Sequence, residues 1–118
     1  MGRQMAFWKY NDGVYLDNQM VYEEACCNGK SVEGLSLLPT EDILRMICEK
    51  LPAYDKLDEY SFESEKGAFE LSYTEQSILF DCSWDMPMND LNTVIDIMAA
   101  FHCPFYDPQI TKRFDSAG

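Results

Sequence analysis

The chain has 118 residues, of which 47% are apolar and 14% aromatic, and its formal net charge is −12. That length supplies enough core for one domain, so we expect a single domain over residues 1–118, with 1–4 as a flexible tail or an artificial addition. The charge argues against direct binding to nucleic acid or to anionic membranes, because both select Lys and Arg. We expect neither a membrane-spanning helix nor a secretory signal.

The N-terminal segment is rich in residues that favour strands. Ala6–Tyr10 and Val14–Leu16 flank Asn11-Asp12-Gly13, and Asp-Gly suits a tight turn, so we predict a first hairpin. Met20–Cys27 is predicted as a short helix ended by Asn28-Gly29. The same Asn-Gly pair could instead turn a hairpin.

The clearest helical pattern is predicted over Ile43–Leu51. Thr40 is the expected N-cap, and Pro52 stops the helix. Apolar residues recur at spacings of three and four, which gives one buried stripe. Its members are Ile43, Leu44, Ile47, Cys48 and Leu51.

The segment Tyr60–Trp84 alternates between apolar and polar residues, and we predict a three-stranded meander. Its turns are expected at Lys66-Gly67 and Thr74–Ser77. Such alternation is typical of a sheet with one face in the core and the other in water. The expected inward positions of the third strand are Ile78, Phe80, Cys82 and Trp84.

A second helix is predicted over Leu91–Phe101, capped by Asn89 or Asp90 and ended by His102-Cys103-Pro104. Its predicted stripe is Leu91, Val94, Ile95, Met98 and Phe101. In the tail that follows, we expect Phe105, Ile110 and Phe114 to hold the chain to the body.

Together these elements predict an α+β fold. We expect an antiparallel sheet of about four to six strands, with two main helices packed on one face.

The five cysteines are predicted to be free thiols in a reducing compartment such as the cytoplasm. Their number is odd, two of them are adjacent, and no spacing indicates a disulfide framework. They are Cys26, Cys27, Cys48, Cys82 and Cys103, of which Cys48 and Cys82 fall at apolar positions of regular patterns.

Acidic residues are concentrated in one part of the chain. Between Asp55 and Asp96 there are eleven acids against Lys56 and Lys66, so this segment carries −9. Carboxylates beside aromatic rings suit recognition of a basic protein, whereas a solvated sheet face that serves solubility is the simpler interpretation. The candidate partner-binding residues are Glu63, Glu65, Glu70, Glu75, Asp81, Trp84 and Asp85.

Other chemistry has little support in the sequence. The single histidine, His102, is adjacent to Cys103, and nothing indicates that it meets Cys26 or Cys27 in space. There is no Cys-x-x-Cys, no calcium loop and no complete phosphate loop. We therefore predict no catalytic residue, no metal and no cofactor.

Two stretches carry a resemblance. Phe7-Trp8-Lys9-Tyr10 precedes Gly13-Val14-Tyr15-Leu16-Asp17, and residues 101–109 read Phe-His-Cys-Pro-Phe-Tyr-Asp-Pro-Gln, with Arg113-Phe114 beyond. Together they resemble small bacterial proteins encoded beside toxins. In size, acidity and lack of a catalytic motif the chain is similar to immunity proteins of polymorphic-toxin and contact-dependent inhibition systems. The resemblance implies a cytoplasmic protein that blocks one cognate toxin, often a cationic nuclease.

Three functions are therefore carried forward. The first is an immunity-type inhibitor that binds a basic toxin domain through an acidic face. The second is a nucleic-acid mimic, of phage or mobile-element origin, that blocks a DNA-binding protein. The third is a small enzyme with a cysteine nucleophile.

Overall fold

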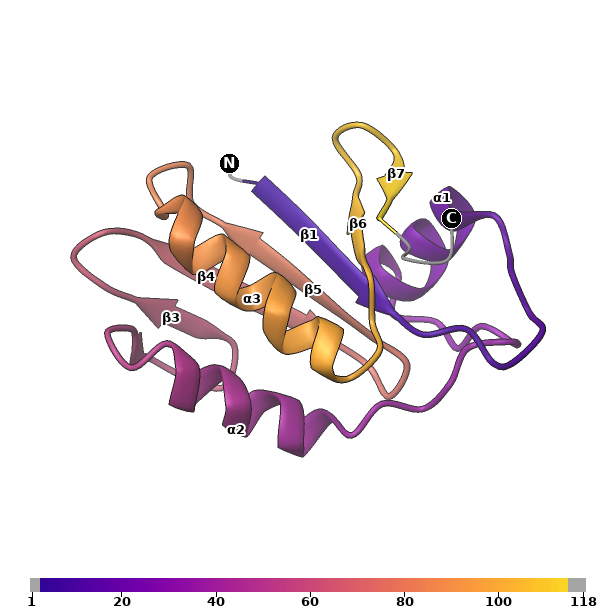
Figure 1. Ribbon diagram of the computed structural model, residues 1–118, viewed down its shortest axis with the longest axis horizontal. Helices are drawn as coiled ribbons and strands as arrows, with labels where there is room; N and C mark the ends of the chain where they lie inside the picture. Colours follow the sequence, from indigo (N-terminus) through magenta and orange to yellow (C-terminus); the bar gives the residue numbers. More distant parts are fainter. Residues whose placement is uncertain (1–2, 115–118) are drawn as a thin grey trace.

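The computed structural model describes residues 3–114 and contains one antiparallel sheet with helices on both faces (Figure 1). The sheet order is β2-β3-β4-β5-β1-β6-β7. The strands are β1 (Arg3–Trp8), β2 (Asp55–Lys56), β3 (Ser61–Glu63), β4 (Ala68–Tyr73), β5 (Ser77–Cys82), β6 (Phe105–Asp107) and β7 (Lys112–Arg113). The helices are α1 (Asn18–Val21), the π-helix η1 (Tyr22–Cys27), α2 (Thr40–Lys50) and α3 (Met88–Ala100).

The α+β class with an antiparallel sheet is confirmed, and so is the three-stranded meander, which forms β3, β4 and β5. Within residues 3–114 the sheet has seven strands, more than the four to six expected. The additional ones include β2 and β7, which have two residues each and are too short to produce an alternating pattern.

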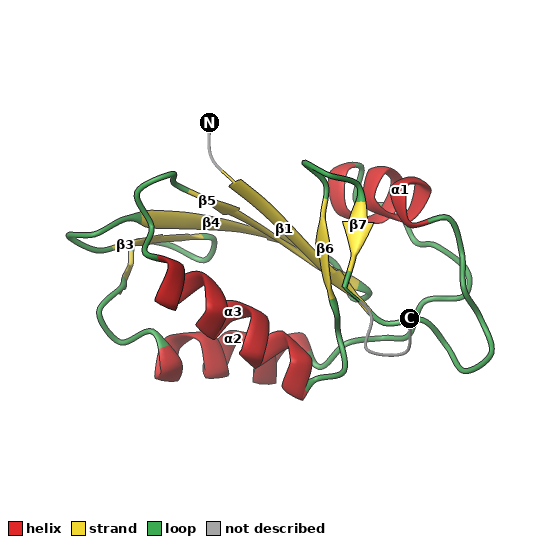
Figure 2. Cartoon of the chain, turned by 45° about the horizontal axis from the view of Figure 1, so that its top comes forward, coloured by secondary structure: helices red, strands yellow, loops and turns green. Residues whose placement is uncertain are grey.

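Helices α2 and α3 pack side by side against one face of the sheet, as predicted (Figure 2). The main core lies between them and the strands. Ile43 and Ile47 of α2 and Val94 and Met98 of α3 are fully buried there, together with Phe80 of β5. Alternating side chains of the strands reach this core, which is why their apolar pattern has a period of two.

A second core lies on the opposite face, where α1 and η1 cover one end of the sheet (Figure 2). Ala6 and Trp8 of β1 point to this side, because they alternate with Met5 and Phe7. Leu79 was expected to face water and is only 8% exposed. The prediction that one face of the sheet is exposed to solvent is therefore wrong at this end of the sheet.

The predicted N-terminal hairpin is wrong. Gly13 does adopt φ +77° and the turn forms, but Val14–Leu16 is not a strand and the chain turns away from β1. Instead β1 lies inside the sheet, between β5 and β6. Arg3 and Gln4 belong to it, so the predicted tail is wrong for these two residues; Met1 and Gly2 lie outside the described residues.

The predicted helix over Met20–Cys27 is confirmed, although it begins earlier and changes form along its length. The side chain of Asp17 accepts hydrogen bonds from the amides of Gln19 and Met20 and so caps α1. The last six residues form the π-helix η1.

Both longer helices are confirmed, but their predicted caps are wrong. Thr40 is the first residue of α2, and Asn89 and Asp90 lie inside α3. The cap positions are held by Pro39 and Pro87, neither of which provides a side-chain cap. A helix can begin directly after either proline because its first amides do not need partners within the helix.

Two apolar assignments on the longer helices are also corrected. Cys48 was expected in the α2 stripe but is exposed, whereas Cys82 is buried as expected. On α3, Ile97 is buried and Ile95 is only partly buried. The predicted stripe is confirmed at Leu91, Val94 and Met98, and Ile97 joins it because it lies three residues after Val94 on the same side of the helix.

The tail forms β6 and β7. Phe105 contacts Phe7 of β1 at 5.9 Å between ring centroids and packs against the main core, so this ring holds the tail as predicted. Phe114 is 47% exposed and stacks on Phe105, which is itself part of the tail. Ile110 is exposed and does not hold the tail.

His102 ends α3 in a left-handed conformation, with φ +65°. Its amide donates to the Ala99 carbonyl at 3.0 Å, and the Cys103 amide donates to the Met98 carbonyl at 2.9 Å, which is a Schellman ending. Glycine adopts this conformation without the steric cost that a β-carbon brings.

We therefore expect His102→Gly to raise the free energy of unfolding by about 0.5–1 kcal/mol. His102→Val should lower it, because a β-branched residue is disfavoured at positive φ. Urea unfolding of both variants checks this, and equal stabilities would contradict the helix ending described above.

Candidate functional site

The end of the sheet that α1 and η1 leave uncovered carries a set of carboxylates. Glu70 alternates with the buried Phe69 and Leu71 on β4, and Asp81 alternates with Phe80 and Cys82 on β5, so both point away from the main core. Four exposed acids share this side through the strand register. We call them the acidic sheet face: Asp55, Glu63, Glu70 and Asp81.

The register places these acids opposite one another. Asp55 pairs with Glu63 across β2 and β3, and Glu70 pairs with Asp81 across β4 and β5. Side chains at directly opposite positions have Cβ atoms about 4.5–5.5 Å apart, and like charges there are destabilising. The row that contains Glu70 and Asp81 continues to Ser61 on one side and to Gln4 on the other, without a cation.

The acidic sheet face has no ion pair to offset this repulsion. Within residues 3–114 the salt bridges join Lys30 to Glu24 and Arg45 to Asp42, and both lie elsewhere. The face therefore presents negative charge that is free to meet an external cation.

Neutralising one opposed pair should stabilise the fold. We expect Glu70→Gln with Asp81→Asn to raise the free energy of unfolding by about 0.2–1 kcal/mol at low salt, and by less as salt rises. Urea unfolding at two ionic strengths measures this. Glu41→Gln with Glu49→Gln on α2 removes the same charge without an opposed pair and serves as the control; an equal gain there would show that only total charge matters.

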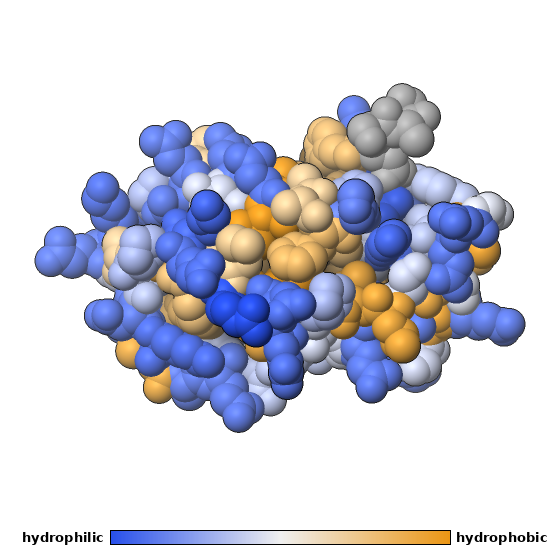
Figure 3. All heavy atoms as spheres, turned by 60° about the horizontal axis from the view of Figure 1, so that its bottom comes forward, coloured by the Kyte–Doolittle hydropathy of each residue, from blue (hydrophilic) through white to orange (hydrophobic). Residues whose placement is uncertain are grey.

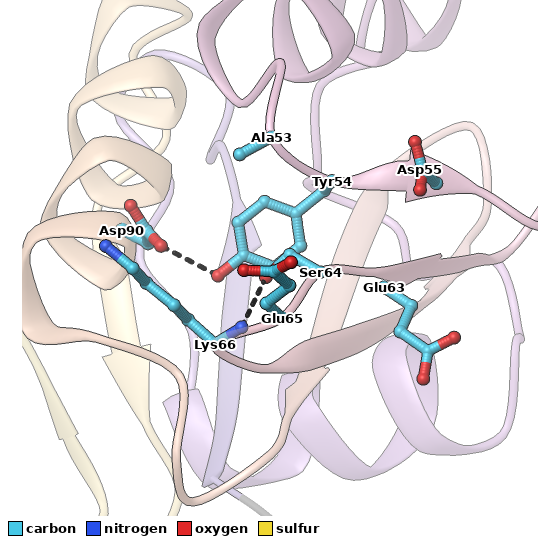
Figure 4. A pocket seen from close by; sticks show the side chains of 8 residues that line it. All are labelled: Ala53, Tyr54, Asp55, Glu63, Ser64, Glu65, Lys66 and Asp90. Atoms are coloured by element: carbon cyan, nitrogen blue, oxygen red, sulfur yellow. Dashed lines mark hydrogen bonds between the residues drawn. The ribbon is translucent and has the colours of Figure 1, made fainter.

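A cleft of about 600 Å³ lies beside this face (Figure 4). The buried Tyr54 hydroxyl donates to an Asp90 carboxylate oxygen at 2.7 Å. Burial and, to a smaller extent, this hydrogen bond raise the pKa of Tyr54 to about 12, so its phenol stays protonated at neutral pH. The lining residues are Ala53, Tyr54, Asp55, Glu63, Ser64, Glu65, Lys66 and Asp90.

Four of the residues that line the cleft carry carboxylates, and Lys66 is the cation among them. Asp55 and Glu63 belong both to this lining and to the acidic sheet face, and Glu65 also lines the cleft (Figure 4). Carboxylates so placed accept charge-assisted hydrogen bonds from Lys or Arg side chains.

The structure brings most of the predicted site residues to one end of the sheet. Glu63, Glu70 and Asp81 lie on the acidic sheet face, and Glu65 lies in the turn between β3 and β4. Trp84 and Asp85 follow β5 in a loop that meets this turn. Two contacts join the loop to it: the amide of Ala68 donates to the hydroxyl of Ser83 at 2.9 Å, and a β-carbon on Gly67 would come within 2.7 Å of Met86 Cα.

Two predicted positions need correction. Trp84 was expected to continue the inward row of β5, but it lies beyond the strand and is 65% exposed, with the Arg3 guanidinium 5.6 Å from its ring centroid. Glu75 lies in the turn between β4 and β5, at the other end of these strands, where its carbonyl accepts from the amide of Leu38. It does not join the acidic sheet face.

Sequence reasoning missed Asp55 and Asp90. Asp55 follows no alternating pattern because β2 has only two residues. Asp90 was predicted to be a helix cap, and nothing in the residues around it indicates that its carboxylate would line the cleft and accept a hydrogen bond from Tyr54. Both positions depend on contacts between distant parts of the chain.

The cysteines are free thiols in the structure, as predicted. Burial raises the pKa of Cys26 and of Cys82 to about 12, and that of Cys103 to about 11. These three are therefore protonated at neutral pH and poor nucleophiles. His102 lies at the end of α3, where its backbone conformation gives it a structural role.

A shallow apolar groove of about 390 Å³ lies on the helix side, between α3 and β6. Figure 3 shows apolar side chains among polar ones on this side. Ile95 and Ala99 line the groove with Phe105 and Phe114, and it belongs to a different surface from the acidic sheet face.

Among residues 3–114, no group of three or more His, Cys, Asp or Glu side chains is placed to hold a metal ion. None of the helices described is both long and apolar enough to cross a membrane.

Comparison with known proteins gives no assignment: no protein-family model matches the chain, and no curated protein matches its sequence.

Proposed function

We propose that this chain is a protein-binding inhibitor of the immunity type, which neutralises a cationic toxin domain, such as a nuclease, in the cytoplasm. The observation that supports this proposal is that acids lie opposite one another on an uncovered sheet face and form no ion pair among the described residues. Such pairs cost stability in the free protein. A partner that brings Lys and Arg side chains to this face removes the repulsion.

The partner is a basic protein. Its cationic side chains contact the acidic sheet face and enter the adjacent cleft, where Asp55 and Glu63 accept their hydrogen bonds. The exposed ring of Trp84, at the same end of the sheet, serves as an apolar anchor of the kind that dominates protein interfaces. The buried thiols of Cys26, Cys82 and Cys103 are poor candidates for a nucleophile, because their raised pKa values leave little thiolate.

The test is capture of partners from the native cell extract with three forms of the immobilised chain. One is the wild type, one carries Glu63→Lys, Glu70→Lys and Asp81→Lys, and one carries Glu41→Lys, Glu49→Lys and Asp96→Lys. The two variants have the same net charge, but the second set lies on α2 and α3.

The proposal predicts one basic protein that binds the wild type and the helix variant but not the sheet variant. Many unrelated DNA-binding proteins on the wild type would favour the nucleic-acid mimic instead. If the sheet variant kept the partner and the helix variant lost it, the interface would lie on the side of α2 and α3, and the assignment to the acidic sheet face would be wrong.

A further inference from the structure

The connection between η1 and α2 contacts the sheet end without joining the sheet (Figure 1). It is anchored on η1 at Lys30, whose amide donates to the Glu24 carbonyl at 2.9 Å. It is anchored again at Leu38, which lies in the main core. We call residues 31–36, between these two anchors, the strap.

A single side chain holds the strap on the β5 side. Gln76 lies in the turn before β5, and its side-chain carbonyl accepts from the Val32 amide at 2.9 Å. Its NH₂ group donates to the Val32 carbonyl at 3.0 Å and to the Leu35 carbonyl at 3.3 Å. Both N–H groups of the carboxamide are thereby used, so Gln76 gives the strap the donors and the acceptor that a neighbouring strand would supply.

Two backbone hydrogen bonds hold the strap on the β1 side. The Ser36 amide donates to the Lys9 carbonyl at 2.8 Å, and the Asn11 amide donates to the Gly34 carbonyl at 2.9 Å. They form an isolated bridge rather than a ladder of strand pairs. The strap is thus fastened by few bonds on each side.

The strap also buries little of its own surface. Val32 is 8% exposed and Leu35 is 5% exposed, and both pack into the second core with Trp8 and Leu79. The other strap residues are exposed or half-buried. Opening the strap therefore costs the burial of two side chains and the bonds named above, whereas global unfolding also loses the main core.

We propose that the strap opens as one unit, with Gln76 as its latch, and uncovers the second core while the main core stays folded. Leu35 is held from both sides, so it leaves the second core only when the bonds on both sides break. The main core and the acidic sheet face do not include the strap. This inference does not depend on the proposed function.

The test is native-state amide hydrogen exchange by NMR, which measures local opening. The reporters are the Asn11 and Ser36 amides, because they bond across the β1 side of the strap and not to Gln76. Gln76→Ala removes the latch. Glu75→Ala is the matched control, since Glu75 lies in the same turn with an exposed side chain.

In Gln76→Ala both reporter amides should exchange at least about tenfold faster and by the same factor, because loss of the carboxamide removes three hydrogen bonds that opening must break. Glu75→Ala should leave both rates unchanged. If Gln76→Ala left the reporters at wild-type rates, the bonds on the two sides would break independently and the proposal would be wrong. Equal acceleration by Glu75→Ala would also overturn the assignment of Gln76 as the latch.

Ile43→Val separates strap opening from global unfolding. Ile43 is fully buried in the main core, so its truncation should speed the slowest amides of β5 by about 2- to 10-fold. The reporter amides should keep their wild-type rates, because strap opening leaves the main core folded. If Ile43→Val accelerated the reporters as much as the slowest β5 amides, the strap would open only with the whole fold, and the proposal would be overturned.

Discussion

Replacing Phe80 with Ala is expected to lower the free energy of unfolding by about 3–5 kcal/mol. Phe80 is fully buried on β5, and its ring contacts Phe7 edge-on at 5.6 Å and Phe69 at 5.8 Å between centroids. Truncation removes apolar contacts from three adjacent strands and leaves a cavity under α2 and α3. Urea unfolding measures the loss, which is a large fraction of the stability of an ordinary domain.

Trp84→Ala is the matched control. Its ring is larger than that of Phe80 but 65% exposed, and its described contact is the cation–π interaction with Arg3. Loss of the ring should cost no more than about 1 kcal/mol. A cost as large as that of Phe80→Ala would mean that the strand positions are misassigned.

Local patterns predicted the parts of the fold that depend on neighbours in sequence. The alternation from Tyr60 to Trp84 identified β3, β4 and β5, and the apolar stripes identified α2 and α3. The position of β1 could not be predicted in this way. Its partner strands begin at Ser77 and Phe105, and no short-range signal in Ala6–Tyr10 distinguishes these partners from an adjacent hairpin strand.

The candidate site shows the same division. The alternating pattern correctly predicted that Glu63, Glu70 and Asp81 point away from the core. Their neighbours Phe62, Phe69 and Phe80 are buried on the other face. Their alignment across strands was not predictable, since a shift of one residue in register changes which side chains face one another. The pairing of β2 with β3 also places Asp55 on this face. Glu75 is not on it, because Glu75 lies beyond the end of β4 in a turn.

Charge reversal on the acidic sheet face is expected to slow binding of the captured partner. Glu63→Lys, Glu70→Lys and Asp81→Lys together should reduce the association rate by about 10- to 100-fold, because electrostatic steering accelerates encounter by such factors. The dissociation rate should change less if Trp84 and other apolar contacts hold the formed complex. Surface kinetics with purified partner measures both rates.

The control is the helix variant with Glu41→Lys, Glu49→Lys and Asp96→Lys, which has the same net charge. Its association rate should stay much closer to that of the wild type, since these side chains lie on α2 and α3, on the opposite side of the sheet. Circular dichroism must show that both variants are folded. Equal slowing by both would mean that net charge, and not this face, determines association.

The dependence of the association rate on salt tests the central claim most directly. The rate should be measured for wild type, sheet variant and helix variant from low to physiological ionic strength, where the screening length falls to about 8 Å. If the acidic sheet face steers a cationic partner, the rate should fall steeply with salt for the wild type and helix variant and stay nearly flat for the sheet variant. A flat wild-type response, or a steep response retained by the sheet variant, would contradict the assignment of binding to this face.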